Sequence, residues 1–413
     1  MLSDLFNYEK ETFFNYINLI GSASYPHLPT IAYKSLPFQT VPHELTYSSS
    51  YFPRAETTRI LTDKANILLH GLFEGSEEYD CDIQPWSGTQ ANQIVFNAVL
   101  KPGDRILALD LKSGGHISYH SFNKRFYNLD TYECGPDGLI DYTELCEKIL
   151  AVKPQLVIIG GSSYPRSFKY EAVHQSCQEV GSLLLADIAH RDIYIAAKLH
   201  ESPFGFADFI TTTTHKALRG PRGGIILYKG KFARQLKNSV FPVMQGAPDI
   251  ASMISKVSCL QFNTPDEVQR FALSARHSIA RFKEFFESKR FPLISDGTDT
   301  HLLLVDIRCT GETGKELERL LEKNMILINR NCIPQDPLKA NLASGIRLGS
   351  LGVASLGFNS EELNFVISQL EQVFQGHQAD VRRIKSLIHE KVSQYLKGWE
   401  NGMSEVKMRM IGQ

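Results

Sequence analysis

The chain has 413 residues, with 44 Lys and Arg against 45 Asp and Glu, a formal net charge of -1. Such a length predicts about two or three domains, and 43% apolar with 22% charged residues is typical of a globular protein. The balanced charge argues against nucleic-acid binding, which needs clustered cations. No apolar run approaches the roughly 18 residues that a membrane span requires.

The first part of the chain predicts a helix followed by an irregular stretch. Residues 1–21 carry apolar side chains at helical spacing, and five prolines between residues 24 and 53 interrupt regular structure. A long irregular stretch is usually functional or packs against a partner. We therefore expect residues 1–44 to form an N-terminal arm.

Residues 45–264 are predicted to form a large domain of alternating helices and strands. Helices are expected over 59–73 and 90–100, and buried strands over 105–110, 155–159, 183–187, 209–214 and 224–228. Buried strands separated by helices predict a mostly parallel sheet. Ligands of such sheets bind at the carboxyl ends of the strands.

A smaller α/β domain is predicted over residues 265–413. Helices are expected over 265–286, 360–374 and 376–397, and strands over 301–306, 325–328 and 345–348. The predicted fold class is therefore α/β, with a mostly parallel central sheet in the large domain and a smaller C-terminal α/β domain.

Seven cysteines are scattered along the chain, and no C-x-x-C pair occurs. An odd, widely spaced set predicts free thiols rather than a disulfide framework or a metal site. The N-terminus also lacks the basic and apolar blocks of a signal peptide. These features predict a cytoplasmic enzyme or binding protein without a metal.

The strongest local signal is the segment from Thr211 to Gly224, in which four threonines precede His215, Lys216 and a glycine-rich turn. Threonines favour a strand, and glycines allow the backbone to approach a ligand closely. A lysine at a strand end is suited to a Schiff base with pyridoxal phosphate (PLP). The alternative is a solvated surface lysine.

Two other strand or helix ends suit the same cofactor. Asp187 and His190 end a buried strand, where an ionised Asp can pair with a pyridinium nitrogen; an ordinary helix cap is the alternative. Ser87, Gly88 and Thr89 precede a helix whose free N–H groups and dipole attract a phosphate. An ordinary N-cap again remains the alternative.

Two further residues stand out more weakly. Glycines before His116 would let its imidazole lie flat on an aromatic ring, although most glycine pairs only form turns. Arg347 lies in an apolar strand and fits a carboxylate through its bidentate fork, with a structural salt bridge as the alternative. No G-x-G-x-x-G, Walker A, H-E-x-x-H or G-x-S-x-G motif occurs.

In this order the segments resemble the serine hydroxymethyltransferase family, PLP-dependent enzymes of fold type I (aspartate aminotransferase-like). The resemblance runs from about residue 80 to about residue 370 and is most specific over Thr211 to Gly224. The other matching segments are Gln84–Asn92, Val99–Asp104, Ser113–His116, Gly138–Tyr142, Ser162–Arg166, Asp187–His190, Phe241–Gly246, Gly297–Leu302 and Ser344–Gly349.

The resemblance implies a role for each matching residue. Lys216 is expected to hold PLP with His215 beside it, Asp187 to meet the pyridine nitrogen, and His116 to stack on the ring. The other residues expected to contact the cofactor are His190 near the phenolic oxygen, Ser162 and Thr213 by hydrogen bonds, Ser87, Gly88 and Thr89 at the phosphate, and Gln245, Gly246 and Tyr47 from a neighbouring subunit. Arg347 and Ser22 are expected to hold the substrate carboxylate.

The implied activity is to make or break the Cα–Cβ bond of a glycine-, serine- or threonine-type amino acid, as a hydroxymethyltransferase, aldolase or transaldolase. The implied assembly is a homodimer with active sites at its interface, or a homotetramer of two such dimers. Two alternatives stay open: another reaction at Cα, such as β-elimination or decarboxylation, and a catalytically silent binding paralogue. Retention of Lys216, Asp187, His116 and Arg347 argues against the silent paralogue.

The chain departs from the family in the loop that carries a family glutamate near folate and the substrate hydroxyl. Ser49 stands at this position, and a serine cannot replace a carboxylate at neutral pH. Glu44 and Glu56 are the nearby carboxylates. Leu111 and Asn331 match folate-contacting positions, so dependence on tetrahydrofolate stays open.

Overall fold

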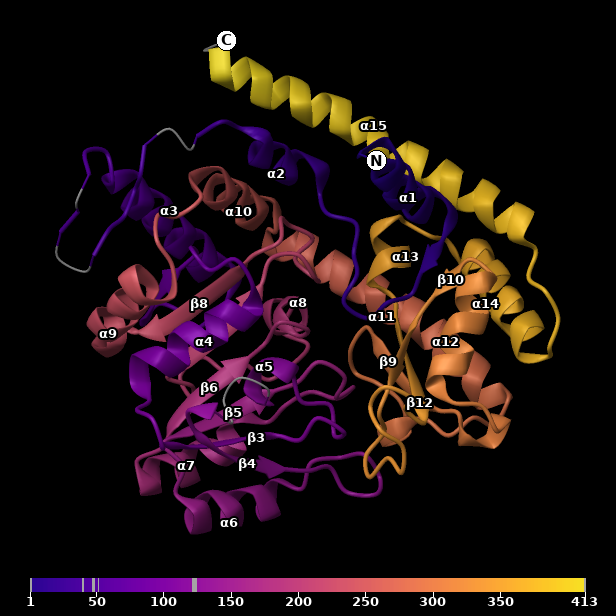
Figure 1. Ribbon diagram of the computed structural model, residues 1–413, viewed down its shortest axis with the longest axis horizontal. Coiled ribbons are helices and arrows are strands. Elements are labelled where there is room, and N and C mark those ends of the chain that lie inside the picture. The colour runs from indigo at the N-terminus through magenta and orange to yellow at the C-terminus, as the bar shows by residue number, and fades with distance from the viewer. Residues whose placement is uncertain (1, 39–40, 47–48, 51, 121–124, 412–413) are drawn as a thin grey trace.

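The computed structural model describes the chain except for residues 1, 39–40, 47–48, 51, 121–124 and 412–413. Figure 1 shows a large sheet with helices around it, a smaller sheet beside it, and a long C-terminal helix along one side of the molecule. In the described ranges, no helix has both the length and the apolar character needed to cross a membrane.

A seven-stranded sheet forms the centre of the larger part, with the strand order β2-β8-β7-β6-β5-β3-β4. Its strands are β2 (Tyr79–Asp82), β3 (Arg105–Leu109), β4 (Asn128–Tyr132), β5 (Leu156–Gly160), β6 (Leu183–Asp187), β7 (Phe209–Thr213) and β8 (Gly224–Lys229). β8 runs antiparallel to both of its neighbours, and the other adjacent pairs are parallel. The prediction of a mostly parallel central sheet is confirmed.

Helices cover both faces of this sheet, which explains why strands β3, β5 and β6 are apolar almost throughout. Along β3, Leu107 and Leu109 point into one hydrophobic cluster, whereas Ile106 and Ala108 point into another on the opposite face. The helices of this part are α3 (Glu56–Leu72), α4 (Gly88–Val99), α5 (Ile117–His120), α6 (Tyr142–Val152), α7 (Tyr170–Val180), α8 (Asp192–Ala196), α9 (Ala233–Asn238) and α10 (Ile250–Phe262).

A second hydrophobic core lies around an antiparallel sheet with the order β11-β12-β9. Its strands are β9 (Leu302–Asp306), β11 (Asn329–Asn331) and β12 (Gly345–Gly349). The helices of this part are α11 (Pro265–Ser288), α12 (Gly314–Lys323), α13 (Leu351–Ser355) and α14 (Ser360–Phe374). Thr313 and Glu316 form a capping box that fixes the start of α12.

Both ends of the chain join this second part, which corrects two of the predicted helices. The helix expected over 1–21 is α1 (Leu2–Asn15), because β1 (Ile17–Asn18) pairs in parallel with β10 (Ile326–Leu327). The helix expected over 376–397 is α15 (Val381–Ile411), which packs against α1 and α2 (Leu28–Ala32). In Figure 1, α15 extends beyond α1 and passes over α2.

Candidate active site

A pocket of about 220 Å³ lies where β6, β7 and the start of α4 meet. It gathers nine of the residues singled out from the sequence, together with Ala189 and Arg222. The nine are Ser22, Ser87, Gly88, Thr89, His116, Asp187, Thr213, His215 and Lys216. The pocket therefore combines an amine, a carboxylate and a helix N-terminus at the carboxyl ends of parallel strands.

Lys216 is held by a tight turn that follows β7. The turn is closed by hydrogen bonds from Gly220 N to Thr214 O (2.7 Å) and from Thr214 N to Gly223 O (3.2 Å). Gly220 is required here, because a Cβ would lie 2.3 Å from Cys259 Sγ. Ser24 Oγ donates to Lys216 O at 2.6 Å, so a segment far away in the chain also fixes this backbone.

The amine of Lys216 belongs to a buried side chain that is 9% exposed. Burial lowers its pKa to about 8; the carboxylate of Asp187 opposes this shift, and the guanidinium of Arg347 adds to it. A larger share of the amine is neutral at neutral pH than for a surface lysine. Neutral amines are the nucleophilic form, as a covalent role requires.

Asp187 is held by three hydrogen bonds. Its Oδ2 accepts from Asn92 Nδ2 (2.9 Å) and from the Tyr119 hydroxyl (2.7 Å), and its Oδ1 accepts from Ala189 N (3.1 Å). Thr211 Oγ1 in turn donates to Asn92 Oδ1 at 2.7 Å, which fixes the orientation of that amide. Three donors stabilise the charged form of a carboxylate, so this acid is suited to face a cationic ring nitrogen.

Asn92 and Tyr119 were not singled out from the sequence. Asn92 is fully buried in α4 on the helix face that also carries the buried Val95 and Phe96, and a polar residue on such an apolar face is a signal that sequence alone offers. Tyr119 carries no comparable signal. Burial and the nearby Asp187 raise the pKa of its phenol well above the usual range, so it acts as a hydrogen-bond donor.

The start of α4 forms a cradle beside Lys216. Ser87 caps the helix by accepting from Gln90 N at 3.1 Å. Gly88 allows close packing, because a Cβ there would lie 2.7 Å from Thr213 Cγ2. Thr213 Oγ1 is buried without a hydrogen-bond partner among the described residues, and a buried orphan hydroxyl costs about 1–3 kcal/mol. This pocket-lining hydroxyl and the free N–H groups of α4 fit a phosphorylated cofactor such as PLP.

Three histidines near the pocket are held in the neutral state. Ser118 N donates to His116 Nδ1 at 3.2 Å, and burial lowers the pKa of His116. Burial and then Arg222 lower the pKa of His215 to about 4. His190 lies behind the pocket, 3.4 Å from His301 Nε2, and burial lowers its pKa well below the usual range. A neutral imidazole at His116 is free to stack on a flat ring.

Arg347 approaches from β12 in the second core. Its Nη1 donates to Ser162 O (2.7 Å) and its Nε to Asn329 Oδ1 (3.2 Å). Gly21 makes room for it, since a Cβ there would lie 2.9 Å from Arg347 Nε. Burial lowers the guanidinium pKa to about 10, so Arg347 stays charged at neutral pH. A guanidinium has five N–H donors, so three remain for a ligand.

The remaining predicted residues do not line this pocket. Gln245 accepts from Gln90 Nε2 (3.2 Å) and donates to Gln84 Oε1 (3.3 Å), next to the cradle. Gly246 has open space where a Cβ would be. Ser162 borders Arg347 through its carbonyl, and Tyr47 lies outside the described residues.

The possible folate-side residues lie elsewhere. Ser49 is exposed in a turn, where its hydroxyl lies 3.1 Å from Thr46 Oγ1. Asn331 donates to Ser163 Oγ at 3.2 Å, and Leu111 is 42% exposed. Among the described residues, no group of three or more His, Cys, Asp or Glu side chains is placed to hold a metal ion.

A mostly parallel α/β sheet with a buried lysine, a fixed acid and a phosphate cradle at its carboxyl edge defines a fold-type I PLP-dependent transferase. The chain belongs to the serine hydroxymethyltransferase family, because the family model described as "Serine hydroxymethyltransferase" matches residues 54–370. It is 38% identical over 349 residues to a serine hydroxymethyltransferase of Coprothermobacter proteolyticus, covering 82% of this chain and 84% of that relative. The predicted family, fold class and type of enzyme are confirmed.

Proposed function

We propose that this enzyme interconverts glycine and a serine-type β-hydroxy amino acid by breaking and forming the Cα–Cβ bond. The observation that carries the proposal is the arrangement of Lys216, Asp187 and the α4 cradle around one pocket, with Arg347 entering from the second core. Membership of the family and the similarity to a serine hydroxymethyltransferase support it.

Each group has a task that follows from its surroundings. PLP, when bound, supplies an electron sink for the bond that breaks at Cα. Lys216 provides the amine that holds the cofactor and afterwards carries a proton. Asp187 would face the ring nitrogen, held in place by hydrogen bonds from Asn92 and Tyr119. The neutral imidazole of His116, which lines the pocket, would lie against one face of the cofactor.

Arg347 fixes the substrate through its carboxylate. The fork of a guanidinium binds a carboxylate with two parallel hydrogen bonds, and this sets the direction of the remaining bonds at Cα. Arg347 would thereby decide which bond at Cα is placed to react. Ser22 lines the same pocket and is placed to assist.

Folate-independent aldol cleavage is a second candidate, and a specific observation favours it. Ser49 stands where the resemblance expects a glutamate, and its hydroxyl lies against Thr46 in an exposed turn. A general acid or base accelerates a step by about 10²–10⁴-fold, so its loss weakens the folate-assisted reaction most. Cleavage of a β-hydroxy amino acid such as allo-threonine makes no use of folate.

The test measures glycine release from serine and from allo-threonine, with and without tetrahydrofolate. If Ser49 has removed the assisting group, tetrahydrofolate accelerates serine cleavage less than about tenfold, and Ser49→Glu raises that acceleration by about tenfold or more. Ser49→Gln is the matched control, with similar size but no charge, and it leaves the acceleration unchanged. A hundredfold acceleration in the native enzyme would instead establish the folate-dependent transferase reaction.

The cofactor assignment has its own test. Borohydride treatment of the coloured protein, followed by peptide mass analysis, is expected to place the reduced cofactor on Lys216. Lys216→Ala is expected to lose the covalent label. A label on another lysine, or colourless protein after incubation with PLP, would overturn the assignment.

We also propose that the enzyme works as a homodimer in which Gln245 and Gly246 serve the partner's cradle. Gly246 supports this because none of the described residues lies within 4 Å of its Cβ position, so packing inside its own chain does not demand glycine there. Close approach of a ligand or a partner is one reason for glycine at such a position.

A further inference from the structure

Arg347 depends on a loop that belongs to the other core. The loop over residues 161–166 follows β5 and offers Ser162 O to Arg347 Nη1 at 2.7 Å. The position of this loop relative to β12 therefore determines where the guanidinium of Arg347 lies.

Arg191 anchors this loop from the side of the large sheet. The side chain is 1% exposed and donates to Gly161 O at 3.0 Å, to Arg166 O at 3.3 Å and to Tyr164 O. Its guanidinium also lies 4.3 Å from the centre of the Phe168 ring. A buried cation that satisfies several carbonyls makes the loop a rigid extension of the large sheet.

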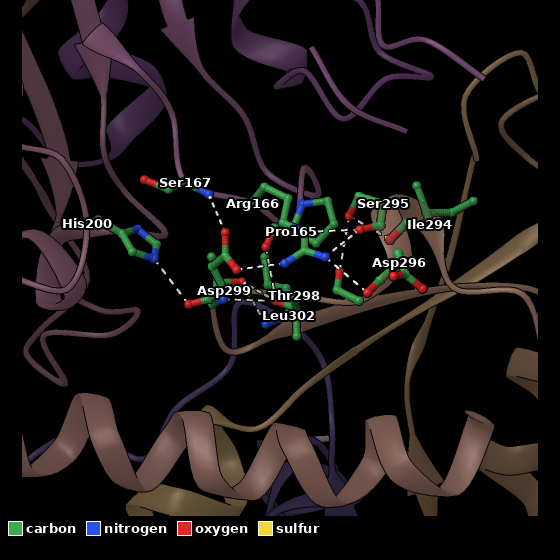
Figure 2. Close-up of polar contacts among 12 residues, drawn as sticks. Pro165, Arg166, Ser167, His200, Ile294, Ser295, Asp296, Thr298, Asp299 and Leu302 are labelled. Carbon is green, nitrogen blue, oxygen red and sulfur yellow. Dashed lines mark hydrogen bonds and ion pairs between the residues drawn. The ribbon is translucent and has the colours of Figure 1, made fainter. Parts of the chain in front are cut away.

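Arg166 ties the same loop to the second core, as Figure 2 shows. Its Nη1 pairs with Asp299 Oδ1 at 2.7 Å, and its Nη2 donates to Ser295 O (2.5 Å) and Asp296 O (3.0 Å). Asp299 N donates to Pro165 O at 3.0 Å, and Thr298 Oγ1 donates to the same carbonyl at 3.0 Å. One side chain thus holds several groups of the 294–299 segment.

The 294–299 segment leads directly into the sheet that carries Arg347. It is followed by β9, in which Leu304 is the register partner of Arg347 on β12. Ser350 N, just after β12, donates to His301 O at 3.0 Å. A displacement of this segment is therefore transmitted to both strands and to the guanidinium.

We propose that Arg166 is a positioning residue for substrate binding: its contacts with Asp299, Ser295 and Asp296 set the distance between Arg347 and Lys216. The inference rests on the proposed role of Arg347 as the carboxylate ligand. Arg166 does not line the pocket. It acts by holding the loop of Ser162 and the β9–β12 sheet as one unit.

The test compares Arg166→Met with Arg281→Met in the holoenzyme. Arg281 is the matched control, because it also pairs with a carboxylate, Glu284 of its own helix (2.5 Å), and bridges from α11 to Asn364 of α14 (2.8 Å), but does not line the pocket. Glycine and ethanolamine, an amine without a carboxylate, are titrated by the change in cofactor absorbance. We expect Arg166→Met to lower the affinity for glycine about tenfold and to change the affinity for ethanolamine by no more than about twofold.

Two further readouts separate positioning from a loss of structure. The KM for serine is expected to rise about tenfold in Arg166→Met while kcat stays within about threefold. In the cofactor-free protein, peptides over 294–301 are expected to exchange amide hydrogen faster, because the bond from Asp299 N to Pro165 O opens more often. Asp299→Asn keeps the size of the side chain and is expected to act in the same direction if Arg166→Met folds poorly.

An unchanged glycine affinity in folded Arg166→Met would overturn the inference, whether or not the 294–301 peptides exchange faster. Arg347→Lys, measured in parallel, distinguishes this from a failure of the proposed function. Arg347→Lys is expected to lower the affinity for glycine by about tenfold or more and to leave the affinity for ethanolamine unchanged. If Arg347→Lys leaves glycine binding unchanged, the carboxylate site itself is wrong and the role of Arg166 is refuted with it.

Discussion

At the scale of single residues, the amine of Lys216 is buried and is acted on by two opposing charges, those of Asp187 and Arg347. Burial lowers its pKa to about 8, against an ordinary value near 10.5. At pH 7 about one amine in ten is then neutral, whereas an exposed lysine has fewer than about one in a thousand. The residue is thus poised to react with an aldehyde at neutral pH.

The rate constant for capture of PLP by the cofactor-free protein is therefore expected to rise about tenfold per pH unit below 8 and to level off above it. An exposed lysine analogue, N-acetyl-lysine amide, keeps gaining neutral amine up to about pH 10.4. The ratio of the two rate constants cancels the titration of PLP itself. It should be constant below pH 8 and fall above it; a ratio constant up to pH 10 would contradict the lowered pKa.

The residues found from sequence are those whose chemical type is unusual in its local pattern. Lys216 after four threonines and Asp187 at the end of an apolar run stand out because charge is rare beside a buried strand. Tyr119 donates to Asp187, which lies 68 positions later in the chain, and no pattern among the residues next to Tyr119 singles it out. Hydrogen bonds between distant elements depend on the fold, so local pattern cannot predict them.

At the scale of elements, the start of α4 must pack closely on β7 for the cradle to form. Gly88 is the contact point, since an added Cβ would lie 2.7 Å from Thr213 Cγ2. Gly88→Ala is expected to push the first turn of α4 away from β7, lowering the free energy of unfolding by about 1–3 kcal/mol. The affinity for PLP should fall by about tenfold or more, because the phosphate donors move with the turn.

Gly71 is the matched control for this prediction. It also lies in a helix, α3, but no atom of the part of the chain that the structure describes lies within 4 Å of its Cβ position. Gly71→Ala is expected to stabilise the protein by up to about 1 kcal/mol, since alanine favours a helix. Denaturant unfolding and PLP titration of both variants are the measurements; equal effects at the two glycines would show that α4 does not need close packing.

Elements with strong periodicity were predicted well, and those formed by distant pairing were not. The buried strands β5 and β6 are apolar runs, and β7 joins two apolar residues to β-branched threonines, so the identity of all three is local. β4 was missed because Asn128–Tyr132 is a half-exposed edge strand with two polar residues at its centre. The local pattern predicts a helix where β1 lies. The strand conformation of β1 comes instead from pairing with β10, about 300 residues later.

At the scale of the whole molecule, the proposed site combines a pocket around Lys216 with Arg347, which does not line that pocket but lies close enough for its charge to act on Lys216. Lys216 and Asp187 come from the large sheet, and Arg347 from the antiparallel sheet of the second core. In the proposed homodimer a third source is added, because Gln245 and Gly246 lie beside their own cradle without lining its pocket. Each complete site of this dimer is then built from two chains: one chain gives Lys216, Asp187 and Arg347, and its partner gives the second copy of residues 245 and 246.

This division predicts complementation between two inactive variants. Lys216→Ala removes the amine of its own site, whereas Gly246→Glu sets a carboxylate against the phosphate of the partner's site without crowding its own chain. In a two-fold symmetric dimer, half of the randomly mixed pairs contain one native site, so activity should return to about a quarter of the native value. Each variant alone, refolded identically, is the control. Activity restored no further than in these controls would show that Gly246 serves its own chain.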